Sequence, residues 1–324
     1  MVDLLASSGL DGLLTSSESP DVSIMPCRSD PSLVLVSSTD FFSPITLDPY
    51  KQGYIAAANT LSDLYAVGVT EVDSVLMLLG LSLSIPEPYS SLVGGLMMKG
   101  FRDCCIAAST CCSGGQTVLN PWPLVGGVAS SVVRRDELIG SHVSIDDDVG
   151  HVIVLTKPLG TQIAGNLAIW MMDVDKWERV LSLGVDEHEA SRAVSLAESY
   201  MMKLNRKAAM VAKQCGAIAA TDVTGFGLLG HAENLALLFS KHDIVIEKLP
   251  VISGLELLER GVTVDYRLTK GYSAETSGGL LIVLRTSRVD EFMRIFQEPA
   301  WVIGSLIKGS GKAIIVPNPE IIKV

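Results

Sequence analysis

Residues 53–67, GYIAAANTLSDLYAV, fit a helix that lies at the centre of the predicted fold. At 100° per residue, Asn59, Ser62 and Asp63 gather on one side of this helix, whereas apolar side chains occupy most of the remainder. Such a helix is expected to be largely buried, and a buried Asp needs a cation or hydrogen-bond donors beside it. The polar stripe therefore favours a metal or nucleotide site, and a solvated face or a local cap is the simpler alternative.

The segments on either side of this helix alternate between strand and helix patterns. Residues 32–39 (SLVLVSST) form an apolar run that ends at Asp40, after a Ser- and Pro-rich lead-in that we expect to be loosely structured. Beyond the helix, a strand, a helix and a strand are predicted at 76–83, 91–108 and 125–134. This alternation, with short Gly-rich connections, predicts close-packed α/β layers.

A second α/β unit begins where residues 157–160 (KPLG) interrupt the pattern after a buried strand at 151–156. A chain of 324 residues exceeds the size at which one core usually stops growing. Two domains are therefore predicted, at 1–155 and 156–324. The further elements expected in the second domain are helices at 187–214 and 227–239, and strands at 217–220, 280–284 and 313–316.

Composition and charge narrow the classes of partner. A formal charge of -11 would repel a phosphate backbone over most of the surface, so nucleic acid is not expected as a partner. The apolar stretches are too short to cross a bilayer and no leader-like segment opens the chain, so we expect a cytoplasmic protein. The adjacent pairs Cys104-Cys105 and Cys111-Cys112 lack the spacing of a zinc site, which predicts buried thiols, with a redox or selenium role as the alternative.

Residues 217–231 (AIAATDVTGFGLLGH) place polar residues between a strand and a helix. Asp222 and Thr224 precede a Gly-spaced turn, and such a helix start favours an anionic ligand whose accompanying cation the carboxylate can hold. A plain N-cap formed by Asp or Thr is an equally good alternative. His231, behind the turn, fits a hydrogen-bonded core residue better than a ligand.

Residues 113–120 (SGGQTVLN) contain two adjacent glycines that we expect to form a turn. Without side chains, Gly114 and Gly115 would let backbone N–H groups approach phosphates closely. A glycine pair is weak evidence when it stands alone.

Four aspartates stand at the ends of predicted strands or helices: Asp21, Asp40, Asp63 and Asp222. Carboxylates without clustered His or Cys suit Mg²⁺ and disfavour zinc. Each unit-charge pair between a carboxylate and a polyphosphate costs about 1 kcal/mol at 4 Å in water and about 4 at an effective dielectric of 20, so divalent ions have to lie between them. The residues by themselves therefore predict an α/β protein with an acidic, glycine-lined phosphate site.

Six ordered segments resemble the selenophosphate synthetases (selenide, water dikinases): STDFFSPI, GYIAAANTLSDLYAVGV, GGQTVLNPWPLVGGVA, LTKPLGTQ, ATDVTGFGLLGH and TSGGLL. They extend across nearly the whole chain, and GGQTVLNPW is most similar to the eukaryotic branch. The resemblance implies an aminoimidazole ribonucleotide synthetase-like fold of two α/β domains with mixed sheets, and a homodimer with an interfacial β-barrel. It also implies that selenide, ATP and water are converted to selenophosphate, AMP and phosphate.

The resemblance also assigns roles to individual residues. The Mg²⁺-binding aspartates of the family are matched by Asp21, Asp63 and Asp222. The ATP contacts are matched by Asp40, Asp63, Gly114, Gly115, Gln116 and Thr117. Several Mg²⁺ ions would then bridge and neutralise the phosphates.

Three departures from the family pattern bear on activity. A Gly-rich segment with Cys or selenocysteine and Lys has no match ahead of Asp21, so we expect a truncated, poorly active chain without the family's catalytic residues. Pro20-Asp21 replaces a paired Asp-Asp, and Ser273-Ala274-Glu275 replaces Asp-Pro-Gln. The alternatives are a non-catalytic, nucleotide-binding dimeric paralogue with a regulatory role, and another ATP-dependent ligase of the superfamily.

Overall fold

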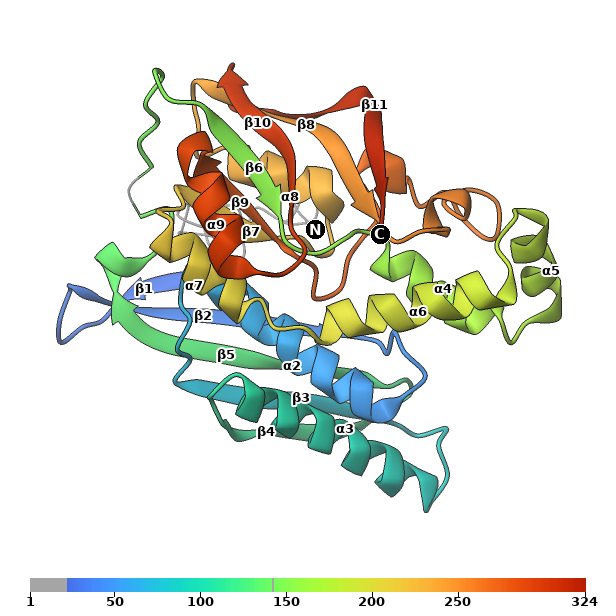
Figure 1. Ribbon diagram of the computed structural model, residues 1–324. Helices are drawn as coiled ribbons and strands as arrows, with labels where there is room; N and C mark the ends of the chain where they lie inside the picture. The colour runs from blue at the N-terminus through green and yellow to red at the C-terminus, as the bar shows by residue number, and fades with distance from the viewer. Residues whose placement is uncertain (1–21, 142) are drawn as a thin grey trace, which may run out of the picture.

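The computed structural model describes residues 22–141 and 143–324, which form two domains, each built on one mixed β-sheet (Figure 1). The five-stranded sheet has the order β1-β2-β5-β3-β4, and only its β3–β4 pair is parallel. Its elements are β1 (Ser23–Pro26), β2 (Leu33–Phe42), α2 (Pro49–Ala66), β3 (Ser74–Ser82), α3 (Tyr89–Ala107), β4 (Cys112–Asn120) and β5 (Leu124–Arg134).

The second sheet has six strands in the order β11-β8-β10-β6-β9-β7, and only its β11–β8 pair is parallel. Its strands are β6 (His151–Leu155), β7 (Ala219–Asp222), β8 (His242–Val251), β9 (Leu280–Arg285), β10 (Trp301–Lys308) and β11 (Ala313–Lys323). The helices of this half are α4 (Thr161–Trp170), α5 (Val174–Ser182), α6 (Glu187–Met202), α7 (Arg206–Gln214), α8 (Gly227–Ala236) and α9 (Val289–Phe296). The chain crosses from the first sheet to the second between β5 and β6, ahead of the boundary predicted after residue 155.

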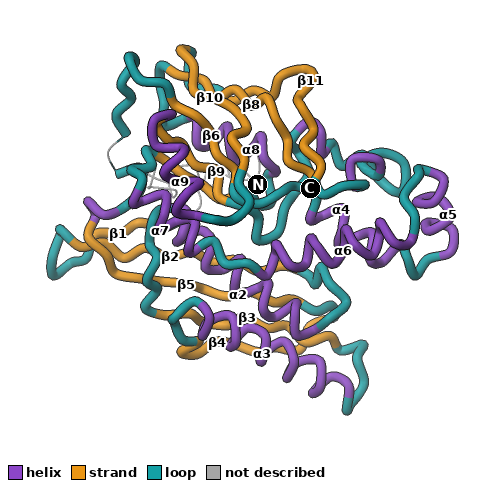
Figure 2. The backbone as a smooth tube through the Cα atoms, viewed as in Figure 1, coloured by secondary structure: helices purple, strands orange, loops and turns teal. Residues whose placement is uncertain are grey.

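Helix α2 lies between the two sheets, as Figure 2 shows, and its existence confirms the helix predicted from residues 53–67. It starts after Asp48, whose carboxylate accepts hydrogen bonds from the N–H groups of Tyr50 and Lys51. It ends at Ala66, just before Gly68 turns the backbone with a φ of 83°. From Gln52 onwards nearly every residue of α2 is buried, so the helix contacts protein on all sides.

Two glycines allow α2 to lie against α3 at backbone distance. A Cβ atom on Gly53 would be 1.9 Å from the carbonyl oxygen of Met97, and one on Gly100 would be 1.9 Å from that of Tyr50. The two helices occupy one face of the first sheet, where they share its apolar core. Any side chain at these two positions would force the helices apart.

Several predicted elements differ from the observed ones. The helix expected at 187–214 is two helices, because the chain turns at Asn205, whose side chain is used elsewhere. The glycine turn expected at 113–120 is strand β4 instead. The lead-in contains β1, whose Met25 pairs with Leu35. Helices α4, α5 and α9 and strands β8 and β10 were not predicted.

The cysteines only partly follow the prediction of buried thiols. Cys104 and Cys105 are buried, and burial raises the pKa of the Cys105 thiol to about 12. Cys111 is exposed and Cys112 is half-buried, so the prediction was wrong for the second pair. Within residues 22–141 and 143–324, no helix is both long and apolar enough to cross a membrane.

The close contact of α2 and α3 can be tested with two substitutions on α3. Gly100→Ala should lower the free energy of unfolding by about 2–3 kcal/mol, because its Cβ overlaps the Tyr50 carbonyl. Gly95→Ala, at an exposed position with nothing within 4 Å, should raise it by about 0.5–1 kcal/mol. Urea unfolding measures both values. Equal effects of the two substitutions would contradict a backbone-to-backbone contact.

Candidate metal and nucleotide site

Asp63 lies near the end of α2, where its side chain meets strand β2. Asp63 is 7% exposed, and its Oδ2 atom accepts a hydrogen bond of 2.5 Å from the hydroxyl of Ser38. Asp40 follows Ser38 by two residues on β2, so the two side chains share one face of the strand. Asp40 and Asp63 therefore belong to the same region of the first domain.

The other polar residues of the α2 stripe bind the second domain. The side-chain oxygen of Asn59 accepts a hydrogen bond of 2.7 Å from the backbone N–H of Ser277. Asn205 donates to the hydroxyl of Ser62 at 2.9 Å and to the carbonyl of Gly278 at 2.7 Å. The solvated-face and local-cap alternatives are wrong for this stripe, because its members are buried and bonded across the domain junction.

Asp222 lies at the end of β7 and is fully buried. The N-cap alternative is wrong, because α8 begins later, after Phe226, and has no side-chain cap. The hydroxyl of Thr224 lies 3.1 Å from Nε2 of His231, which is buried. His231 is therefore the hydrogen-bonded core residue that the sequence predicted.

One turn, residues 276–279, joins the surroundings of Asp63 and Asp222. The backbone N–H of Val223, the residue after Asp222, donates to the carbonyl of Gly279 at 3.0 Å. A Cβ on Gly278 would lie 2.0 Å from the carbonyl oxygen of Val223, so a glycine is required for this approach. Ser277, in the same 276–279 segment, donates its backbone N–H to Asn59, which precedes Asp63 by one turn of α2. The 276–279 turn therefore hydrogen-bonds both to the residue after Asp222 and to the helix that carries Asp63.

Lys157 is a buried cation beside this turn that sequence reasoning did not single out. Its ammonium group donates to the carbonyls of Ser277 at 2.7 Å and Lys203 at 2.6 Å. Burial lowers the pKa of Lys157 to about 7, against the opposing effect of the Asp222 charge. The KPLG break in the sequence pattern was the signal that could have identified it.

Glu275, in the segment that departs from the family pattern, binds the start of α4. Its buried carboxylate accepts hydrogen bonds from the backbone N–H groups of Gly160 at 2.7 Å and Thr161 at 2.8 Å, and from the Thr161 hydroxyl. It thereby satisfies the start of α4, where the helix dipole favours negative charge. Burial nevertheless raises the pKa of Glu275 to about 7, against the effect of these bonds.

The predicted nucleotide loop lies apart from the aspartates. Gly114, Gly115, Gln116 and Thr117 are exposed and pair with β3 at the edge of the first sheet. Two strands, β5 and β3, separate β4 from β2, which corresponds to about 14 Å at the usual strand spacing. These residues can offer only an edge strand, not a turn, to a ligand.

The donor set of the described residues suits Mg²⁺ and not a metal that needs a dense cluster. Among these residues no group of three or more His, Cys, Asp or Glu side chains could hold an ion, and Asp21 lies outside them. Mg²⁺ is commonly bound by one or two carboxylates, with water and substrate phosphates as the other ligands. Asp63 and Asp222 fit that requirement.

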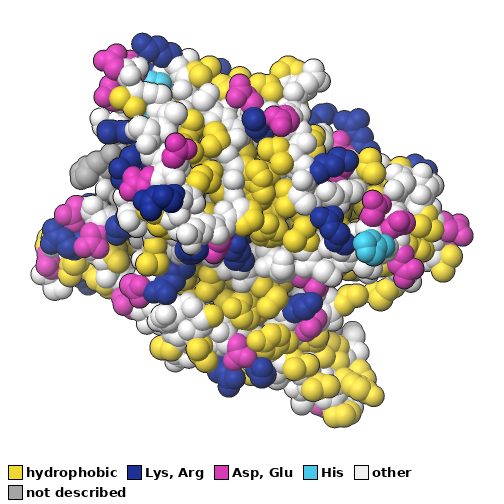
Figure 3. All heavy atoms as spheres, in the orientation of Figure 1, with side chains coloured by type: hydrophobic (Ala, Val, Ile, Leu, Met, Phe, Trp, Pro, Cys, Tyr) yellow, Lys and Arg dark blue, Asp and Glu magenta, His cyan; other side chains and the backbone are white. Residues whose placement is uncertain are grey.

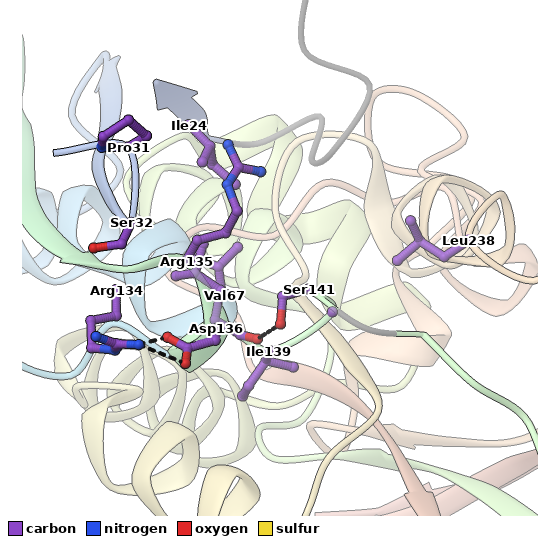
Figure 4. A pocket seen from close by; sticks show the side chains of 12 residues that line it. Ile24, Pro31, Ser32, Val67, Arg134, Arg135, Asp136, Ile139, Ser141 and Leu238 are labelled. Carbon is purple, nitrogen blue, oxygen red and sulfur yellow. Dashed lines mark hydrogen bonds and ion pairs between the residues drawn. The ribbon is translucent and has the colours of Figure 1, made fainter. Parts of the chain in front are cut away.

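A cavity of about 500 Å³ contains none of the predicted site residues (Figure 4). It lies where the chain leaves the first sheet, and Leu238 closes it from the second domain. Arg134 and Asp136 form a two-pronged ion pair at its wall, with both contacts at 3.0 Å. The cavity is therefore separate from the acidic site.

Comparisons with known proteins place the chain in a family. Residues 21–133 match the model "AIR synthase related protein, N-terminal domain", and residues 148–317 match its C-terminal counterpart. The chain is 42% identical over 308 residues to a selenide, water dikinase of Dictyostelium discoideum, covering 91% of this chain and 83% of that protein. Selenide, water dikinase 2 of Mus musculus is also 42% identical, over 94% of this chain and 68% of that protein. The chain belongs to the selenide, water dikinase family.

Solved structures support the fold of this selenide, water dikinase homologue. Thiamine monophosphate kinase from Aquifex aeolicus superposes with a TM-score of 0.67 at 16% identity, covering 99% of this chain and 96% of that one. The hydrogenase maturation protein HypE, solved with ATP, gives 0.62 at 14% identity, covering 87% and 81%. At such identities these likenesses concern the fold alone. Together with the two family models, they confirm the predicted two-domain fold of the AIR synthase type.

The buried Glu275 predicts a pH dependence of stability. A carboxyl whose pKa is raised on folding stabilises the protein below its ordinary pKa, and this contribution is lost as the pH rises through about 7. Between pH 4.5 and 7 the loss should reach about 3 kcal/mol, whereas Glu275→Gln should abolish it. Urea unfolding of both proteins across this range gives the difference. Parallel pH curves for the two proteins would refute the assignment.

Proposed function

We propose that this chain makes selenophosphate from selenide, ATP and water, releasing AMP and phosphate, at a site that includes Asp40, Asp63 and Asp222. One structural observation supports this proposal in addition to family membership. Asp63 and Asp222 are buried carboxylates from different domains, and Ser38 orients the first of them. Asn59, one helical turn before Asp63, and Val223, the residue after Asp222, both hydrogen-bond to the same turn, 276–279. A polyphosphate bound between the domains would meet both carboxylates.

Mg²⁺, when bound with ATP, neutralises phosphate charge and stabilises the charge that develops in phosphoryl transfer. Asp63 and Asp222 would hold it, and Asp40 would contact the nucleotide from β2. The chain's own contribution is positioning, because Ser38 orients the Asp63 carboxylate and the 276–279 turn holds the residues around Asp222.

The aspartates should be required for Mg²⁺-dependent nucleotide binding. Asp63→Asn and Asp222→Asn each remove an anionic ligand at similar volume, so ATP affinity in Mg²⁺ should fall about tenfold or more. Asp148→Asn, at an exposed position, removes the same charge and should bind ATP normally. Titration calorimetry with and without Mg²⁺ measures the effect. Wild-type affinity in both site variants would remove them from the site.

The same preparations, supplied with selenide, distinguish an enzyme from a non-catalytic paralogue. An enzyme should form AMP and selenophosphate from ATP only when selenide is present. ATP binding without selenide-dependent AMP formation would favour the regulatory paralogue.

We also propose that the chain forms a homodimer through the uncovered face of the first sheet. Helices α2 and α3 lie on the opposite face, while Met25, Leu35 and Val132 pair side by side across β1, β2 and β5 with exposures of 53%, 41% and 45%. A contiguous apolar face of this kind indicates an interface. Two such faces together would form the barrel implied by the family. Figure 3 shows the opposite, helix-covered side of this domain, where apolar side chains at the start of α3 lie outside the proposed interface.

The dimer can be tested by placing one charge in this row. Leu35→Asp would bury a carboxylate between the copies, so the dimer dissociation constant should rise about a hundredfold or more. Val174→Asp introduces the same change at an exposed position on α5 and should leave the dimer intact. Sedimentation at micromolar concentration gives the mass. If the Leu35→Asp variant dimerises as tightly as the wild type, this face is not the dimer interface.

A further inference from the structure

Lys157 is the one fully buried lysine at the domain junction within the described residues, and the proposed chemistry does not use it. It is 2% exposed, and both of its observed hydrogen bonds go to backbone carbonyls, one on the 276–279 turn and one at the end of α6. An ammonium group held in this way cannot reach a ligand in solvent. Its contacts point to a positioning role.

Ser277, which accepts one of these bonds, has an unusual backbone. Its φ is 46°, in the left-handed region that side chains other than glycine rarely adopt. Both backbone polar groups of this residue are bound, since the N–H donates to Asn59 and the carbonyl accepts from Lys157. The conformation is therefore held from two directions, by α2 on one side and by the end of β6 on the other.

The turn transmits this constraint to the residue after Asp222. Gly279 accepts a hydrogen bond from Val223, and a Cβ on Gly279 would lie 2.4 Å from the backbone nitrogen of Lys157. Lys157, the turn and Val223 are thus in direct backbone contact. A shift of the turn would move Asp222 relative to Asp63.

We propose that Lys157 is a positioning residue, whose ammonium group fixes the 276–279 turn so that Asp63 and Asp222 hold one cation together. This inference rests on the proposed function. Removing the ammonium group would release the carbonyls of Ser277 and Lys203 without changing either carboxylate. The effect should therefore appear in the Mg²⁺ requirement and not in the binding of the nucleotide without metal.

Three variants separate hydrogen-bond donation from charge. Lys157→Met keeps the apolar stem and should raise the Mg²⁺ concentration for half-maximal ATP binding about tenfold. Lys157→Gln keeps two N–H donors without the charge and should recover part of this loss. Lys207→Met removes a surface lysine that pairs with Glu298, and should behave as the wild type.

Titration calorimetry of ATP at increasing Mg²⁺ is the measurement, with Asp222→Asn alongside. If Asp222→Asn binds as the wild type, the proposed function fails. Two results would overturn only the positioning role. In the first, Mg²⁺-dependent ATP binding is impaired in Asp222→Asn but not in Lys157→Met. In the second, Lys157→Met and Lys157→Gln are equally impaired. Should Lys157→Met fail to fold, Lys157→Ala is tested with propylamine, which returns an ammonium group to the space. Recovery of Mg²⁺-dependent binding supports the role, and its absence contradicts it.

Discussion

Helix α2 is buried on nearly all sides, so each of its neighbours has to accommodate a helix that has no solvent face. Gly53 and Gly100 have no side chains, so the backbones of α2 and α3 can touch. On the side of the first sheet, α2 packs into an apolar core. On the side of the second domain, α2 is hydrogen-bonded, because Asn59 and Ser62 would otherwise be buried without partners. The domains are therefore coupled through the same helix that carries Asp63.

Charge is concentrated where the domains meet. The 276–279 turn has Lys157 on one side and Glu275 immediately before it, and burial moves the pKa of each towards about 7. Each charged group is bound by backbone groups of opposite polarity, carbonyls for the ammonium and N–H groups for the carboxylate. Buried charges held in this way are costly unless all their bonds are made. The hydrogen bonds of Lys157 and Glu275 therefore hold the turn and the residue before it in place.

The sequence predicted the central features and missed the long-range ones. Periodicity was sufficient for α2 and for strands β2, β3 and β5 of the first sheet, since their burial patterns are local. The break at Asn205 could not be predicted, because its cause is a bond to Ser62, 143 residues away. Gly114 and Gly115 looked like a turn, yet strand pairing with β3 keeps them extended. Lys157 and Glu275 gain their roles only from the turn that the fold brings beside them.

The central claim is that carboxylates from both domains hold one divalent cation. It is tested most directly by growing crystals with Mn²⁺, which takes the same oxygen ligands as Mg²⁺, and a non-hydrolysable ATP analogue, and measuring the anomalous scattering of the metal. The account predicts a peak within bonding distance of both Asp63 and Asp222, beside the phosphates. A metal bound to the phosphates with neither carboxylate, or to only one of the two, would contradict it.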